Sequence, residues 1–127
     1  IVIIASIGAI SPMPKSSIYA SAKAGAYAYG RSLNEEVRQK QISVTVSLPG
    51  YVKTSAHRRA GLTHLEEQIP KWMWVSPEQV VNETEEASLK GRASIIPGTV
   101  YRTVSPFLGS KAANSAWRLL NKRGKSI

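Results

Sequence analysis

The chain has 127 residues, of which 43% are hydrophobic, and it carries a formal net charge of +9 at pH 7. This length and composition predict one globular domain and exclude a disordered chain. The absence of cysteine excludes disulfide bridges and cysteine-based metal sites. No apolar run reaches the ~20 residues that a membrane-spanning helix needs, so we expect a cytoplasmic protein.

The chain opens on a short apolar run, residues 1–6, that ends in small residues. Such a run is typical of the end of a buried parallel strand. It is too short for a signal peptide and lacks the charged residues that precede one. We therefore interpret it as a strand already under way, and we expect the complete protein to have an earlier half before Ile1.

Strands and helices are predicted to alternate along the rest of the chain. Helices are expected where apolar residues recur at steps of three and four, and strands where β-branched residues run into a Pro-Gly pair. In chain order we first expect a loop at 8–17, a helix at 17–40 capped by Ser16 or Ser17, and a strand at 42–48. An irregular or partly helical segment at 51–75 and a helix from Ser76 to about Leu89 should follow. The chain should end with a strand at 93–96 and two helical pieces broken near Ser105 and Pro106, with a frayed end at 124–127. The inward face of the first helix is expected to carry Ala22, Ala26, Tyr29, Leu33 and Val37. This order of elements predicts an α/β fold with a parallel sheet.

Basic residues gather toward the carboxyl end of the chain. No acidic residue follows Glu86, whereas eight basic residues do: Lys90, Arg92, Arg102, Lys111, Arg118, Lys122, Arg123 and Lys125. Such a stretch can bind nucleic acid or an anionic membrane surface, or it can form a solvated face. We favour the solvated face and expect no nucleic-acid partner, because no nucleic-acid-binding motif accompanies the charge. Peripheral membrane contact through this end is the second interpretation. His57 and His64 are interpreted as solvated, so no metal site is expected.

Tyr19 and Lys23 lie four residues apart at the start of the first predicted helix, so their side chains share one face. A nearby ammonium ion favours a phenolate, which improves a tyrosine as an acid or base near neutral pH. Ser6 ends the preceding strand, 13 residues before Tyr19, and its hydroxyl could hydrogen-bond a substrate oxygen on which charge develops. By itself the Tyr–Lys pair also fits a helix on which the lysine is merely exposed.

The sequence around these residues resembles the short-chain dehydrogenase/reductase family. The shared features are a strand ending in Ala5-Ser6, the 13-residue gap, the stretch Ile18-Tyr19-Ala20-Ser21-Ala22-Lys23-Ala24, and a next strand that runs into Leu48-Pro49-Gly50-Tyr51-Val52-Lys53-Thr54. The resemblance covers residues 1 to about 54. It implies a truncated Rossmann-like, doubly wound parallel sheet, made of the last three strands with their flanking helices. It divides the chain into a catalytic segment at 1–54, a substrate lobe and helix at 55–92, and the last strand with basic helices at 93–127.

The resemblance also implies a role for each matching residue. Tyr19 would exchange a proton with the substrate oxygen, Lys23 would favour the ionised form of Tyr19 and hold the cofactor ribose, and Ser6 would polarise the substrate oxygen. The implied cofactor-binding residues are Tyr19, Lys23, Pro49, Gly50, Val52 and Thr54. The cofactor would be NAD or NADP, with NADP favoured, and hydride would pass between its nicotinamide and a small-molecule ketone or secondary alcohol.

Some features of that family have no counterpart in these 127 residues. The Gly-rich turn that seats the pyrophosphate, the residue that separates NAD from NADP, and an asparagine of the fourth helix are all missing. We therefore expect the chain to be inactive by itself. Two alternatives remain: a catalytically silent relative that serves as an interaction module, and a basic protein that binds membrane surfaces.

Two surfaces of the predicted fold are candidates for contacts. Apolar and aromatic residues of the substrate lobe could wall an apolar substrate pocket, or equally cover the core: Leu62, Leu65, Trp72, Met73 and Trp74. The far side of the first helix is expected to be smooth and to permit close approach at Ala24, Ala28, Gly30 and Arg31. The resemblance implies that this helix pairs with a second copy in a homo-oligomer.

Overall fold

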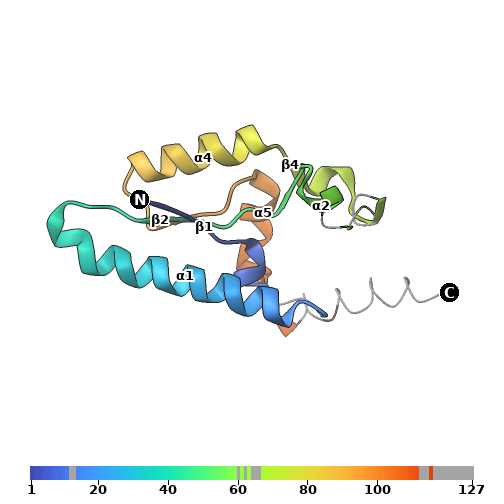
Figure 1. The fold of residues 1–127 in the computed structure, drawn as a ribbon, viewed down its shortest axis with the longest axis horizontal. Coiled ribbons are helices and arrows are strands. Elements are labelled where there is room, and N and C mark those ends of the chain that lie inside the picture. Colours follow the sequence, from blue (N-terminus) through green and yellow to red (C-terminus); the bar gives the residue numbers. More distant parts are fainter. Residues whose placement is uncertain (12–13, 60, 62, 64–66, 112–114, 116–127) are drawn as a thin grey trace.

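The computed structural model describes residues 1–127 except 12–13, 60, 62, 64–66, 112–114 and 116–127. Its core is a three-stranded parallel sheet made of β1 (Val2–Ile4), β2 (Thr45–Ser47) and β5 (Ser94–Ile95), in the order β1-β2-β5. The long helix α1 (Ser17–Val37) lies on one face of this sheet and α4 (Pro77–Leu89) on the other (Figure 1). The predicted α/β fold with three parallel strands between helices is confirmed.

The central strand, β2, is buried on both faces. Val2 to Ile4 pair in parallel with Thr45 to Ser47, and Val46 and Ser47 pair with β5 on the other side. The alternating hydroxyl residues of this strand do not face water. Thr45 Oγ1 donates to the carbonyl oxygen of Arg92 at 2.6 Å, and the hydroxyls of Ser47 and Thr84 share a hydrogen bond of 2.8 Å. These partners allow polar side chains to be buried on a strand covered by helices.

Helix α1 packs against the sheet through small and polar residues. A Cβ on Gly30 would lie 2.4 Å from Val46 Cγ2, so glycine lets the helix approach the central strand closely. Asn34 is buried, and its Oδ1 accepts the N–H of Val44 at 2.8 Å. Ala26 and Tyr27 join the core beside them. Residues 38–40 then continue as a 3₁₀ turn.

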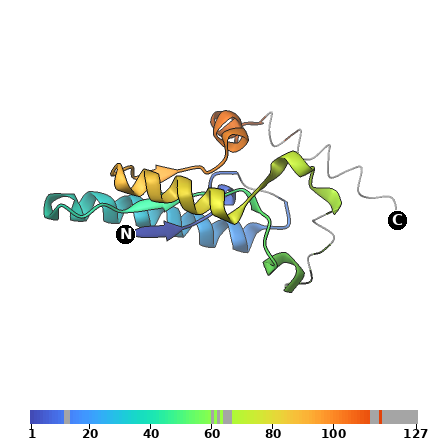
Figure 2. The ribbon, with the colours of Figure 1, turned by 90° about the horizontal axis from the view of Figure 1, so that it is seen from above.

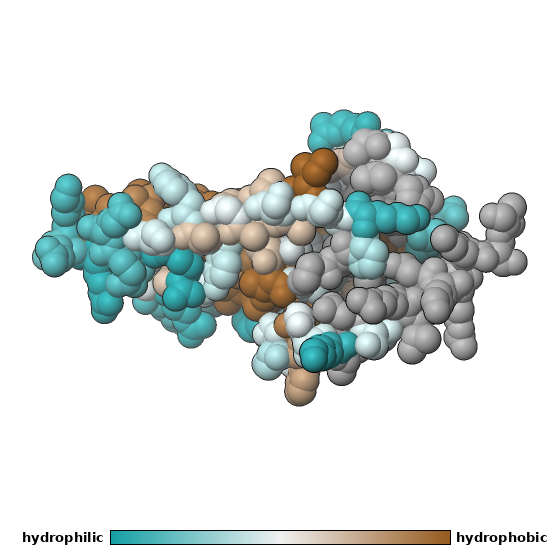
Figure 3. Space-filling view, turned by 90° about the horizontal axis from the view of Figure 1, so that it is seen from below, coloured by the Kyte–Doolittle hydropathy of each residue, from teal (hydrophilic) through white to brown (hydrophobic). Residues whose placement is uncertain are grey.

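Two details of the predicted α1 are wrong. Tyr29 is 63% exposed and Ala22 is also exposed, so the inward face is rotated from the predicted one. Gly30 lies against the sheet rather than on the outer side. The outer face, onto which Figure 3 looks, is pale along most of the helix and strongly hydrophilic at the end near residue 40. Ser16 does stand at the N-cap position, but its side chain makes no capping hydrogen bond.

Helix α4 begins where the sequence predicts. Ser76 is its N-cap, with the side chain accepting the N–H of Gln79 at 3.1 Å, and Pro77 occupies the first turn. Val80, Thr84 and Ala87 form its buried side. This spacing of four and three places one face of the helix against β2 and β5.

A second, two-stranded parallel sheet follows Gly50. It pairs β3 (Tyr51–Val52) with β4 (Trp74–Val75), within a segment for which the sequence predicted only irregular or helical structure. The chain between these strands forms α2 (Ala56–Arg59) and a 3₁₀ turn at Lys71–Met73. After β5, α5 (Thr99–Val104) passes into a 3₁₀ turn at Ser105–Phe107, which is the predicted break. Figure 2 shows α5 standing apart from the sheet layers, beside the segment that holds β4.

Candidate active site

The candidate residues gather where the strands of the main sheet end. Because β1, β2 and β5 are parallel, their carboxyl ends share one edge, which is the usual place for ligand binding in open α/β sheets. Ser6 follows β1, and Pro49 and Gly50 follow β2. The N–H of Ile7 donates to the carbonyl oxygen of Pro49 at 2.9 Å. The loops after β1 and β2 are thus joined directly.

Ser6 and Tyr19 meet at Gly8. Ser6 is 8% exposed, and its Oγ accepts the N–H of Gly8 at 3.1 Å. The position that a Cβ on Gly8 would take is 3.2 Å from Tyr19 Cε1 and 3.5 Å from Ser6 Oγ. The phenol ring is 49% exposed, so a ligand can reach it. Because Ser6 Oγ is already an acceptor, its hydroxyl proton can be donated to a ligand.

Lys23 stands one helical turn beyond Tyr19. Its Nζ lies 5.9 Å from the centroid of the Tyr19 ring and 3.4 Å from the carbonyl oxygen of Ile4, at the end of β1. An ammonium group has three donors, so this single long contact leaves donors for the hydroxyls of a ligand. The structure therefore brings Ser6, Tyr19 and Lys23 to the same edge of the sheet.

The residues predicted to contact the cofactor after β2 differ in how far they are buried. Gly50 is tightly packed, since a Cβ there would lie 2.1 Å from the ring of Tyr101. Val52 belongs to β3 and packs in the second apolar cluster, around Val75 and Tyr101. Thr54 is exposed, and its Oγ1 accepts the N–H of Ala56 at 3.3 Å, just before α2. Of these predicted contacts after β2, Thr54 is the one with a side-chain hydroxyl.

A second phenol, that of Tyr51, directly follows the Pro49–Gly50 turn. Burial raises the pKa of Tyr51, and the charge of an ionised Tyr19 raises it further. The Tyr51 ring packs on Trp74, with centroids 5.8 Å apart. Burial is also the main reason that the pKa of Tyr101 is raised. Both phenols are thus held neutral beside the candidate site.

The predicted apolar wall is divided between the core and the surface. Met73 packs in the second apolar cluster, whereas Trp72 is 65% exposed. Trp74 Nε1 donates to the carbonyl oxygen of Ile69 at 3.3 Å. Leu62 and Leu65 lie outside the described residues. Trp74 also packs on the ring of Tyr51, which follows the Pro49–Gly50 turn.

The family model of the short chain dehydrogenases matches residues 1–64, half of the chain. The chain belongs to the short chain dehydrogenase family. The match contains Ser6, Tyr19, Lys23 and the whole of the segment around Pro49 and Gly50. It ends within the segment predicted to be a substrate lobe, before β4.

Two curated relatives of this short chain dehydrogenase carry the name 3-oxoacyl-[acyl-carrier-protein] reductase. The Mus musculus protein is 29% identical over 92 residues, which cover 69% of this chain and 39% of that protein. The Homo sapiens protein is 37% identical over 54 residues, which cover 42% of this chain and 23% of that protein. The chain thus matches well under half the length of either relative.

A solved short chain dehydrogenase from Mycobacterium paratuberculosis, bound to NAD, has a similar fold. The TM-score is 0.54 at 18% sequence identity, covering 76% of this chain and 42% of that one. At this identity the similarity supports the fold alone. It agrees with the parallel order of β1, β2 and β5.

Three residues near the site escaped the sequence analysis as functional candidates: Gly8, Tyr51 and Tyr101. Gly8 could have been noticed, because it lies two residues after Ser6 and glycine permits close approach. Tyr51 directly follows Gly50. Tyr101 had no such signal, since its contacts with Tyr51 and Gly50 span about fifty residues of sequence.

Among the described residues, no helix is long and apolar enough to cross a bilayer. Across the same part, no three His, Asp or Glu side chains gather in a group that could hold a metal ion. Arg118, Lys122, Arg123 and Lys125, which are among the basic residues that suggested membrane contact, lie outside the described residues.

Proposed function

We propose that the natural protein containing these residues is a nicotinamide-dependent oxidoreductase that interconverts a ketone and a secondary alcohol, with Tyr19 as its acid/base. The observation that carries this proposal is the meeting of Ser6 Oγ and the Tyr19 ring at Gly8, with Lys23 one turn away. A carbonyl oxygen placed there would face two hydroxyl donors and a nearby cation. This is the arrangement that stabilises developing negative charge.

The residues have separate tasks in reduction. Ser6 donates its hydroxyl hydrogen bond to the substrate carbonyl oxygen, while its own oxygen accepts the N–H of Gly8. Tyr19 then transfers its phenolic proton to the same oxygen, and the phenolate that remains is stabilised by the Lys23 ammonium. Bound nicotinamide supplies the hydride. In oxidation each proton movement runs in reverse.

The donors at the sheet edge fit the polar nicotinamide end of NAD or NADP. Lys23 offers an ammonium for ribose hydroxyls, Tyr19 shares that position, and Thr54 offers a hydroxyl beyond the Pro49–Gly50 turn. Val52 contributes backbone and apolar surface. We favour NADP over NAD, and the ratio of kcat/KM for NADPH and NADH measures the preference. A higher value for NADH contradicts it.

A 3-oxoacyl thioester is the first substrate to test, because two relatives are named 3-oxoacyl-[acyl-carrier-protein] reductases. The Tyr51–Trp74 pair beside the site provides an aromatic wall suited to an apolar acyl chain. Simple apolar ketones form the second substrate class.

We also propose that the outer face of α1 joins two copies of the complete protein. Ala28 and Arg31 are exposed there, and Ala24 is partly so. Sedimentation of the natural protein as a monomer at micromolar concentration contradicts this pairing.

A cytoplasmic location stays our prediction, and microscopy of a tagged protein tests it. No contact among the described residues favours the interaction-module or membrane-surface alternative over the oxidoreductase.

The experiment is Tyr19→Phe in the natural protein, with oxidation of NADPH or NADH followed during reduction of the substrates above. Loss of the phenolic proton should lower turnover ~10²–10⁴-fold while leaving cofactor affinity nearly unchanged. Tyr29→Phe is the matched control, because Tyr29 lies on the same helix and is 63% exposed. A Tyr19→Phe variant that keeps more than a tenth of the turnover removes Tyr19 from the mechanism.

A further inference from the structure

The hydroxyl of Tyr101 lies between two segments that are distant in sequence. Tyr101 belongs to α5 and is only 5% exposed. Its hydroxyl donates to the carbonyl oxygen of Met73 at 2.6 Å and accepts the N–H of Tyr51 at 3.1 Å. One oxygen atom thus joins the first residue of β3 to the residue that precedes β4.

This hydroxyl occupies the place of a backbone hydrogen bond. Tyr51 pairs with Trp74 and Val52 with Val75, and the N–H of Lys53 donates to the carbonyl oxygen of Val75 at 3.0 Å. Two residues back along each strand, the regular parallel pattern would join the N–H of Tyr51 to the carbonyl oxygen of Met73. The phenol oxygen is inserted between these two groups instead. It holds the strands apart at that end while satisfying both of them.

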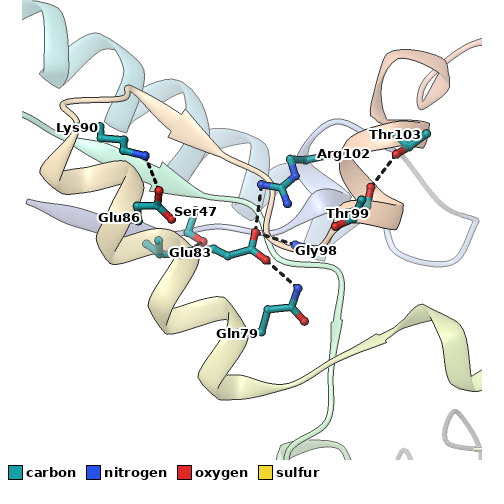
Figure 4. A network of polar contacts seen from close by, with 10 residues as sticks. Ser47, Gln79, Glu83, Glu86, Lys90, Gly98, Thr99, Arg102 and Thr103 are labelled. Carbon is teal, nitrogen blue, oxygen red and sulfur yellow. Dashed lines mark hydrogen bonds and ion pairs between the residues drawn. The ribbon is translucent and has the colours of Figure 1, made fainter.

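The Tyr101 ring and its helix fix the position of this oxygen. The ring fills the space beside Gly50, where a Cβ would lie 2.1 Å from Tyr101 Cζ. Helix α5 is in turn tied to α4 by Glu83 (Figure 4). The Glu83 carboxylate accepts the N–H of Gly98 at 3.1 Å and pairs with Arg102 at 3.2 Å. The hydroxyl is therefore carried by a helix that is anchored to α4, which packs on the three-stranded sheet.

We propose that Tyr101 is a positioning residue that sets the separation between the Pro49–Gly50 turn and the substrate lobe at β4. This proposal rests on the proposed function, since the turn is our candidate contact for nicotinamide and β4 carries the Trp74 side of the substrate wall. Tyr101 touches neither reacting group. It acts through the backbone of Tyr51 and Met73, which place the two halves of the site relative to each other.

The chemistry of the phenol suits this task. Only a neutral hydroxyl can donate to one backbone group and accept from another with the same atom. Burial, the largest influence on this group, raises the pKa of Tyr101, so the neutral form persists throughout the physiological pH range. The ring leaves no room for a side chain at Gly50.

Tyr101→Phe in the natural protein tests the proposal. The phenyl ring still fills the space beside Gly50, so the N–H of Tyr51 and the carbonyl of Met73 lose their partner without closing on each other. We expect turnover at saturating cofactor and substrate to fall ~10–100-fold, because a small misplacement of reacting groups has this effect. The Kd for the cofactor should change less than threefold, and the amide of Tyr51 should exchange its hydrogen about tenfold faster.

Thr45→Val is the matched control. It removes one buried hydroxyl hydrogen bond, that from Thr45 to the carbonyl oxygen of Arg92, at the amino end of β2, away from the carboxyl edge that carries the proposed site. It should reduce stability by a similar amount and leave turnover unchanged. If Tyr101→Phe loses no more turnover than Thr45→Val, the positioning role is overturned. If the unmodified protein turns over no substrate, the proposed function fails, and amide exchange then decides: unchanged exchange at Tyr51 overturns the inserted hydroxyl as well.

Discussion

Gly8 controls how closely Tyr19 and Ser6 approach each other. A Cβ at residue 8 would already be 3.2 Å from Tyr19 Cε1, and the two methyl groups of valine would displace the ring. We therefore expect Gly8→Val to lower turnover ~10–100-fold through misplacement of the phenol. Gly25→Ala is the control, because nothing lies within 4 Å of its added Cβ. Equal turnover in the two variants would show that the spacing at Gly8 does not matter.

Tyr51 and Tyr101 make the folded state sensitive to alkali. Burial raises the pKa of both phenols, so the unfolded chain ionises them at a lower pH than the folded chain does. Their contribution to stability is complete below about pH 10, the ordinary tyrosine pKa, and is lost as the pH rises through the raised values. Urea unfolding of the natural protein across this range should show the loss. The double variant Tyr51→Phe/Tyr101→Phe should lose less stability between neutral and alkaline pH, and an identical loss would contradict the assignment.

Helix α1 depends on Gly30 for its seat on the sheet. Alanine at residue 30 would bring a Cβ within 2.4 Å of Val46 Cγ2 and 3.1 Å of Ile3 Cδ1, so the helix must lift or the strands must shift. We expect Gly30→Ala to lower the free energy of unfolding by about 1–3 kcal/mol. In the same helix, Gly25→Ala should raise it by roughly 0.5–1 kcal/mol. Urea unfolding of both variants checks the pair, and a stabilised Gly30→Ala would contradict the packing.

The sequence predicted elements whose cause is local. Helix α4 follows from Ser76 and Pro77, and the buried strand at 45–47 from its β-branched residues. The inward face of α1 was mispredicted because Gly30 and Asn34 look neutral or polar, although one allows close approach and the other satisfies the N–H of Val44. The pairing of β3 with β4 was missed, because its strands have two residues each and depend on Tyr101.

The candidate site likewise contains residues placed by local structure and residues placed by contacts distant in sequence. Ser6, Tyr19 and Lys23 were predicted from their spacing together with the resemblance of the surrounding sequence to the family, and a strand end and one helical turn determine where they lie. Gly8 and Tyr51 are adjacent to predicted residues but act through tertiary contacts. Tyr101 reaches the Pro49–Gly50 turn from α5, about fifty residues further along the chain, and no sequence pattern encodes a contact over that separation.

At the scale of the whole molecule, β1 pairs among the described residues with β2 on one side and with no strand on the other. Apolar side chains in and just before this strand are largely exposed, with Ile1 at 60%, Val2 at 45% and Ile4 at 53%. A strand edge of this kind promotes association. We expect the 127-residue chain by itself to associate as its concentration rises, to lack a cooperative thermal transition, and to bind NADH and NADPH weakly.

Sedimentation and thermal unfolding of the isolated chain, with and without cofactor, check this expectation. Ile4→Lys should reduce association, because a charge at the exposed edge opposes pairing between chains. A monomer that unfolds cooperatively and is stabilised by millimolar cofactor would contradict it.

The most direct test of the oxidoreductase assignment is to follow the hydride itself. The natural protein would be supplied with nicotinamide cofactor deuterated at the transferable position, together with 3-oxoacyl thioesters or apolar ketones, and the alcohol product analysed by mass spectrometry. We expect one deuterium on the carbinol carbon, and almost none when Tyr19→Phe replaces the unmodified protein. Label transfer that is as fast with Tyr19→Phe, or product formation without deuterium, would contradict the proposed chemistry.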